Sequence, residues 1–216
     1  MVSAPRRPWG SSPDRVTTGL AQALSIVGHP ALVMPSAVVW TAALKNAPPA
    51  VLVAAVAASG FVLVSVGAYS LIQVRAGRWQ HVDASAPHER RQLNHVLALL
   101  LFGVAGGLWW SGQPGAVALG LALGGAVVVF ASLLRHWLKL SLHAAFAEFA
   151  AALLWPSLVP VLLALALAAG VAWSRLVLRR HNCQEVLVGL LTGAAAGVGF
   201  HFIVAWSTNP GPAGAP

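Results

Sequence analysis

Long apolar runs follow one another along the chain, separated by short breaks that carry charge, proline or glycine. An α-helix rises about 1.5 Å per residue, so a run of roughly 20 apolar residues can cross the hydrocarbon core of a bilayer. The pattern therefore predicts an all-α, polytopic integral membrane helix bundle with about seven transmembrane helices. The expected spans are Leu20–Leu44, Ala50–Val74, His95–Trp110, Gly115–Leu134, Trp137–Trp155, Leu158–Leu178 and Val186–Trp206.

The fifth of these runs has the weakest membrane character. Trp137–Trp155 is short and carries Lys139, His143 and Glu148. Ionisable side chains are costly inside the hydrocarbon core, so this segment is expected either to cross the membrane or to be re-entrant. A re-entrant segment would leave six spans.

Prolines and glycines modify this picture of straight helices. Pro30 and Pro35 lie inside the first run and are expected to kink it, because proline lacks the backbone donor that a helix uses. Glycines recur in the third, fourth and seventh runs at spacings that let neighbouring helices approach closely. They are Gly103, Gly106, Gly107, Gly120, Gly124, Gly125, Gly189, Gly193 and Gly197.

The composition excludes an ordinary soluble domain. Hydrophobic residues occupy 58% of the 216 positions and charged residues only 8%, whereas about a quarter of the residues of a soluble domain are charged. Residues 18–206 are expected to form one membrane helical domain, between a disordered cytoplasmic tail at 1–17 and a flexible tail at 207–216. The single Cys183 leaves no internal disulfide and no cysteine cluster, so neither a metal nor a cofactor is expected. Membrane lipids are the expected partners, nucleic acid is not, and the oligomeric state stays open.

The basic residues are distributed unevenly between the two predicted sides. Twelve of the thirteen Lys and Arg residues fall in the N-terminal tail or in connections on its side, and only Lys45 falls opposite. Five of these twelve residues are candidates for a functional site. Without them, seven basic residues on one side still face one on the other. Cytoplasmic loops carry an excess of Lys and Arg, so the N-terminus and these loops are expected to face the cytoplasm, with the chain in a bacterial inner membrane.

The strongest candidate for chemistry begins at Ser174, where the sequence reads Ser-Arg, five residues, His181, three residues, Glu185. His181 and Glu185 are four residues apart, so on a helix that begins here they would share one face and the carboxylate could hold the imidazole. Such a contact fixes the tautomer and raises the basicity of the other ring nitrogen, as a nucleophilic or general-base histidine requires. A basic loop that only anchors the topology is the alternative.

A second pattern, Lys139-Leu140-Ser141-Leu142-His143, lies at the N-terminal end of the fifth run. A helix N-terminus presents free amides and a positive dipole end, so a hydroxyl and a cation there would form an anion cradle. A capping or interfacial histidine is the alternative for His143. Both patterns fall on the same predicted side of the membrane, as a shared site demands.

These two patterns resemble motifs of the phosphatidic acid phosphatase type 2 superfamily, whose members include lipid phosphate and diphosphate phosphatases. The third motif of that family is Ser-Arg, five residues, His, three residues, Asp. Ser174, Arg175 and His181 match it at the same spacing, and Glu185 stands in place of the aspartate. The resemblance covers about residues 74–206.

The other two motifs of the family are matched less completely. Pro-Ser-Gly-His is similar to residues 140–143, where Ser141 and His143 are retained and leucines replace the proline and the glycine. The first motif, Lys, six residues, Arg-Pro, has no clean counterpart. Lys139 or a cation of the basic loop between the second and third runs, residues 75–91, could supply its charge. The alternative is a charged loop that closes on its own acidic residues, Asp83 and Glu89. The loop candidates are Arg78, Arg90 and Arg91.

The resemblance implies phosphoryl transfer without a metal. His181 would attack phosphorus to give a phosphohistidine, Glu185 would orient the ring, and His143 would protonate the leaving oxygen and then activate water. The expected substrate is a lipid phosphate or diphosphate whose headgroup reaches a site at the cytoplasmic interface. The residues expected to hold phosphate oxygens are Ser141, Lys139, Arg175, Arg78, Arg90 and Arg91.

Other interpretations stay open. Glu148 lies seven residues beyond Ser141 on the same helical face, so it is a possible accessory residue that closes the site or binds a headgroup. A small transporter or channel would instead use Glu148 with His29 and His201 along a polar path. A non-catalytic relative of the phosphatases would explain the replaced motif residues.

Overall fold

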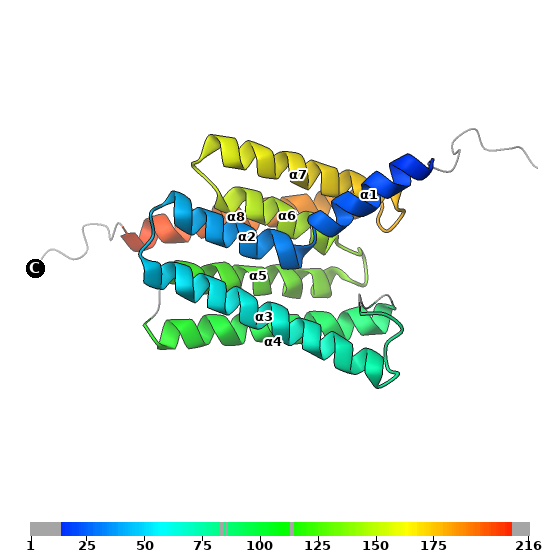
Figure 1. The fold of residues 1–216 in the computed structure, drawn as a ribbon, viewed down its shortest axis with the longest axis horizontal. Helices are drawn as coiled ribbons and strands as arrows, with labels where there is room; N and C mark the ends of the chain where they lie inside the picture. The colour runs from blue at the N-terminus through cyan, green and yellow to red at the C-terminus, as the bar shows by residue number, and fades with distance from the viewer. Residues whose placement is uncertain (1–13, 83, 85, 113–114, 209–216) are drawn as a thin grey trace, which may run out of the picture.

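The computed structural model describes residues 14–82, 84, 86–112 and 115–208, which form eight α-helices and no β-strand (Figure 1). The all-α prediction is therefore confirmed. The helices are α1 (Arg15–Val27), α2 (Pro30–Leu44), α3 (Pro49–Arg75), α4 (Pro87–Trp110), α5 (Gly115–Leu134), α6 (Leu142–Leu153), α7 (Leu158–Val177) and α8 (Cys183–Thr208).

The predicted tails fall mostly outside the described residues, which exclude 1–13 and 209–216. The last part of the N-terminal tail belongs to α1, because the carboxylate of Asp14 accepts a hydrogen bond of 2.7 Å from the backbone N–H of Thr17. This contact caps the helix by satisfying a backbone donor that has no partner inside it.

Five helices of the described chain, α3, α4, α5, α7 and α8, are long and apolar enough to cross a membrane. Helices α1 and α2 pass the same test together but are bent by 52° at their junction, so they count as a sixth, broken span. Helix α6 has 12 residues and is therefore about 18 Å long, too short to cross. The predicted count of seven is not confirmed, because seven residues after α5, 135–141, form a turn and a coil before α6 begins.

Short helix α6 lies inside the bundle, packed against α8, α7 and α2. Eight of its twelve residues are buried. Phe146 and Phe149 join the main hydrophobic core with Val128 of α5 and Phe200 of α8. Helix α6 therefore serves as a buried support for α2, α7 and α8.

Two side chains satisfy the C-terminal end of α6 inside the bundle. The hydroxyl of Thr41 in α2 donates to the carbonyl of Leu153 at 3.2 Å. Nε2 of His201 in α8 lies 2.8 Å from the carbonyl oxygen of Ala152, which can only accept, so the ring nitrogen donates. The last carbonyls of a helix have no partner within it. His201 thus has a structural role in the fold.

Glycines of α8 let that helix approach α6 closely. A Cβ atom added at Gly193 would collide with the carbonyl oxygen of Ala145 and lie 2.9 Å from Cβ of Glu148. At Gly189 it would lie 2.7 Å from the carbonyl oxygen of Ser141. The expected close packing is therefore present at α8. It is absent at three glycines of α4, because a Cβ atom added there would have no described atom of another helix within 4 Å. They are Gly103, Gly106 and Gly107.

The connections between helices gather at two ends of the bundle (Figure 1). The start of α1 and the α3–α4, α5–α6 and α7–α8 connections share one end, and the α2–α3, α4–α5 and α6–α7 connections share the other. The predicted sidedness of the basic residues agrees with this arrangement. It also places the two sequence patterns with candidate chemistry at one end.

Candidate active site

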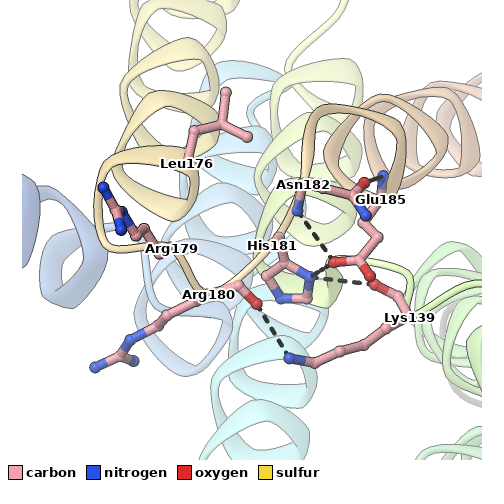
Figure 2. Close-up of a pocket in the computed structure, with 7 residues that line it drawn as sticks. All are labelled: Lys139, Leu176, Arg179, Arg180, His181, Asn182 and Glu185. Carbon is pink, nitrogen blue, oxygen red and sulfur yellow. Dashed lines mark hydrogen bonds and ion pairs between the residues drawn. The ribbon is translucent and has the colours of Figure 1, made fainter. Parts of the chain in front are cut away.

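The centre of the candidate site is the imidazole of His181, in the connection between α7 and α8 (Figure 2). Its Nδ1 atom lies 2.9 Å from Oε2 of Glu185 and 3.1 Å from the carbonyl oxygen of Lys139. Both neighbours are acceptors, so Nδ1 carries a proton and donates it. In the neutral ring this leaves Nε2 unprotonated, with its lone pair available.

Glu185 holds this position because it also forms part of the cap of α8. Its Oε2 accepts from the backbone N–H of Asn182 at 3.2 Å, and its own N–H donates to Oδ1 of Asn182 at 2.9 Å. This reciprocal pair is a capping box. The helix thus begins after His181, and the carboxylate reaches back to the ring instead of sharing a helical face with it. Asn182 was not singled out from the sequence, although Asn-x-x-Glu before an apolar run signals such a cap.

Two further hydrogen bonds join the Lys139 segment to the His181 segment. The Lys139 ammonium donates to the carbonyl oxygen of Arg180 at 3.0 Å. The backbone N–H of Ser141 donates to the carbonyl oxygen of Glu185 at 3.1 Å. The two sequence patterns with candidate chemistry, 42 residues apart at His181 and Lys139, therefore meet in space.

An open pocket of about 360 Å³ surrounds this contact. Three of its residues are cationic, and the guanidinium groups of Arg179 and Arg180 extend away from the His181 ring in Figure 2. Both arginines are exposed, so these long side chains can turn toward a bound anion. The lining residues are Lys139, Leu176, Arg179, Arg180, His181, Asn182 and Glu185.

The turn that forms this pocket depends on an unusual backbone conformation. Arg179 has φ of +52°, in the left-handed region that favours glycine. The backbone N–H groups of Arg180 and His181 then both donate to the carbonyl oxygen of Arg175, at 3.0 and 3.3 Å. Sparsely populated backbone conformations are concentrated at functional sites. The end of α7 is therefore held in the shape that presents His181.

The electrostatic environment favours the neutral form of His181. Burial and the positive charge of Lys139 lower the pKa of His181 below its usual range, while the hydrogen bond to the Glu185 carboxylate opposes them. Burial and the nearby charge of Arg90 likewise lower the pKa of Lys139. A neutral imidazole with a carboxylate on Nδ1 can act as a nucleophile near neutral pH.

His143 and Arg175 lie in an adjacent cluster and do not line the pocket. Buried Arg175 of α7 donates through Nη1 to the hydroxyl of Ser25 in α1 at 2.9 Å. The ring of His143, in the first turn of α6, contacts the ring of His29, with centroids 5.0 Å apart. The charged or titratable groups that act on His143 are Arg175, His29, His181 and Arg180.

Ser141 is placed differently from the expectation for a phosphate ligand. Its side chain is buried, and its hydroxyl accepts from the backbone N–H of Ala144 at 3.5 Å as the N-cap of α6. It does not line the pocket. In this structure the hydroxyl supports the helix that carries His143.

The three arginines considered for the first motif are separated. Arg78 donates to the side-chain oxygen of Gln73 at 3.3 Å, Arg91 is exposed, and Arg90 acts electrostatically on Lys139. Glu89 accepts from the backbone N–H groups of Gln80 and Ala86, so the loop closes on this acid as the alternative proposed. Asp83 lies outside the described residues. Of the three arginines, the structure brings Arg90 toward the site.

Glu148 lies two turns beyond Ser141 along α6, where its Cβ faces Gly193 of α8. It is not a lining residue of the pocket. Among the described residues, no group of three His, Cys, Asp or Glu side chains could hold a metal ion. Comparisons with protein families, with curated proteins and with solved structures found no match.

Proposed function

We propose that this protein is a membrane-embedded phosphatase that hydrolyses a lipid phosphate or diphosphate through a phosphohistidine at His181. One observation carries the proposal: Nδ1 of His181 is engaged by a carboxylate and a backbone carbonyl, so Nε2 is available inside a cationic pocket. The resemblance of this segment to the third motif of the type 2 phosphatidic acid phosphatases supports the same chemistry.

In the proposed first step, Nε2 of His181 attacks phosphorus and the bond from phosphorus to the lipid oxygen breaks. Glu185 stabilises the imidazolium that forms, as a carboxylate does for a catalytic histidine. Lys139 and the exposed arginines of the pocket, Arg179 and Arg180, bind the phosphoryl oxygens, whose charge dominates the energetics of phosphoryl transfer. The leaving oxygen takes a proton from His143, which has to reach it from the adjacent cluster.

In the second step, His143 removes a proton from water, and the water oxygen attacks the phosphohistidine. The N–P bond breaks and inorganic phosphate leaves, which restores both imidazoles. The lipid tail stays in the membrane, because the pocket lies at the end of α7 and at the start of α8, two helices long enough to span. The mechanism needs no metal, and the proposed test is phosphate release in the presence of EDTA.

A panel of isoprenoid and glycerolipid monophosphates and diphosphates tests this function with the full chain in detergent or lipid vesicles. Release of phosphate in excess EDTA from at least one of them is the expected result, and vanadate should inhibit it. No release from the whole panel would favour a non-catalytic relative. A strict magnesium requirement would also contradict the mechanism.

We further propose that the basic end of the bundle faces the cytoplasm, in the inner membrane of a bacterium, because Lys and Arg are concentrated in cytoplasmic loops. The native Cys183 is exposed at the start of α8, beside the pocket. A membrane-impermeant maleimide is therefore expected to label Cys183 only after the cells are permeabilised. Labelling in intact cells would place the site on the outer side.

The pH dependence of the reaction should respond in opposite directions to two substitutions. The rate falls as pH drops through the pKa of His181, because protonated imidazole cannot attack. Lys139→Met removes a charge that lowers this pKa, so the acid limb of kcat/KM should move to higher pH. Glu185→Gln removes the group that raises it, so the limb should move to lower pH.

Arg135→Met is the matched control for these two variants. This exposed cation lies on the same α5–α6 connection as Lys139, and it donates to the carbonyl of Ser132. Its acid limb should coincide with that of the wild type. Shifts of the Lys139 and Glu185 variants in the same direction would contradict the proposed environment of His181.

A further inference from the structure

The junction between α1 and α2 is docked onto α7 beside the candidate site. Gly28, at the 52° bend, lies so close to Val171 of α7 that a Cβ atom there would collide with the valine side chain. One turn earlier, the Ser25 hydroxyl accepts from Arg175 at 2.9 Å. Two contacts with the same face of α7 therefore hold the junction in a fixed position.

This docking brings His29 to His143. His29 is the N-cap of α2, and its Nδ1 accepts from the backbone N–H of Ala31 at 3.2 Å. Because Nδ1 accepts, the proton of the neutral ring is on Nε2. The two imidazoles meet at an interplanar angle of 87°, with their centroids 5.0 Å apart. This edge-to-face arrangement is a favoured geometry for aromatic pairs.

We propose that His29 is a positioning residue for His143, supplied to the site by the break in the first membrane span. This inference rests on the proposed function for the part that concerns catalysis. The perpendicular contact limits rotation of the His143 ring, and the capping bond fixes the His29 ring in turn. His143 otherwise lies among Arg175, Arg180 and His181, which are cationic or titratable groups that could not hold it by attraction once it is protonated.

The helices packed around the α1–α2 junction are consistent with the positioning role of His29. Helix α1 contributes Ser25 and helix α7 contributes Arg175, while α6 carries His143 in its first turn. The α1–α2 junction thus adds a fourth segment to a site formed by the starts of α6 and α8 and the end of α7.

Two substitutions separate the ring of His29 from its capping role. Asparagine is a good N-cap without a ring, so His29→Asn keeps the cap and removes the contact with His143. Phenylalanine has a ring but cannot accept from Ala31, so His29→Phe keeps the contact and loses the cap. If His29 positions His143, kcat should fall roughly 10- to 100-fold in His29→Asn, as for a small misplacement of a catalytic group. His29→Phe should keep most of the wild-type kcat, with KM little changed in both.

A measurement that needs no activity accompanies the kinetics. In NMR spectra of protein labelled with ¹⁵N and ¹³C in histidine, the His143 ring resonances should shift in His29→Asn. His136→Asn, a change at an exposed histidine of the α5–α6 connection, should leave them in place. Unperturbed His143 resonances in His29→Asn would overturn the inference even if the protein hydrolyses lipid phosphates. Full activity of His29→Asn, or a greater loss in His29→Phe, would also overturn it. A shift of the resonances without any hydrolysis would uphold the contact and reject the proposed function.

Discussion

Replacement of His181 by alanine is expected to lower phosphate release by at least about 10³-fold, as the loss of a nucleophile does in other covalent mechanisms. One ring nitrogen of His181 is held by both a carboxylate and a backbone carbonyl, which leaves the other nitrogen to attack phosphorus. Lys139, Arg179 and Arg180 could still bind the phosphoryl group without His181, but no atom would be available to form the N–P bond. The loss should therefore fall on kcat more than on KM. Phosphate release from the lipid substrate measures both.

His136→Ala is the matched control, since this exposed histidine lies on the same end of the bundle outside the pocket. It should keep wild-type activity. The thermal stability of both variants in detergent shows whether the bundle is intact. An active His181→Ala protein would contradict the proposed mechanism, and it would leave the transporter and non-catalytic interpretations.

The second large effect is expected at the contact of α6 with α8, where Gly193→Ala should destabilise the bundle. The added methyl group would meet the carbonyl oxygen of Ala145 and lie 2.9 Å from Cβ of Glu148, both on α6. Overpacking of this kind costs about 1–3 kcal/mol. A protein of this size should then melt roughly 4–8 °C lower in detergent for a loss of about 2 kcal/mol.

Gly199→Ala provides the comparison on the same helix, because nothing lies within 4 Å of a Cβ atom added there. Alanine has a higher helix propensity than glycine at both positions. The difference between the two melting temperatures therefore isolates the contact with α6. Equal melting temperatures would contradict the close packing of α8 on α6.

Much of the fold could be predicted because an apolar run long enough to span a membrane indicates a helix over the same residues. Helix α5 coincides with its predicted span, Gly115–Leu134. The fifth run could not be interpreted this way, since the apolar pattern continues through residues that the structure uses for a turn. Helix α6 ends inside the bundle because Thr41 and His201, distant in sequence, satisfy its last carbonyls. No local pattern carries that information.

The candidate site was predictable where its contacts are local. His181 and Glu185 are four residues apart, and their pairing was expected from that spacing, although α8 begins at Cys183 and the ring lies outside the helix. The Asn-x-x-Glu pattern of the cap at Asn182 was also present in the sequence, but the cap was not predicted. It explains why a glutamate serves at position 185, because its longer side chain can reach both the ring and the N-cap backbone.

Other parts of the site come from contacts that only the tertiary structure creates. Ser25 and Arg175 are 150 residues apart in the sequence, and His29 meets His143 across the bend between α1 and α2. Pro30 and Pro35 predicted an irregularity in this first span, but not the helix against which it would dock. The docking depends on the missing side chain of Gly28, whose role is visible only beside Val171.

A search for a phosphoryl enzyme tests the central claim most directly. The purified protein is mixed with a ³²P-labelled lipid phosphate in excess EDTA, quenched during turnover at alkaline pH, and mapped by mass spectrometry. A phosphoryl group on His181 that is lost in acid is the predicted result, with none on His181→Ala. Turnover of the lipid phosphate with label on another residue, or with no covalent intermediate under rapid quenching, would contradict the phosphohistidine mechanism.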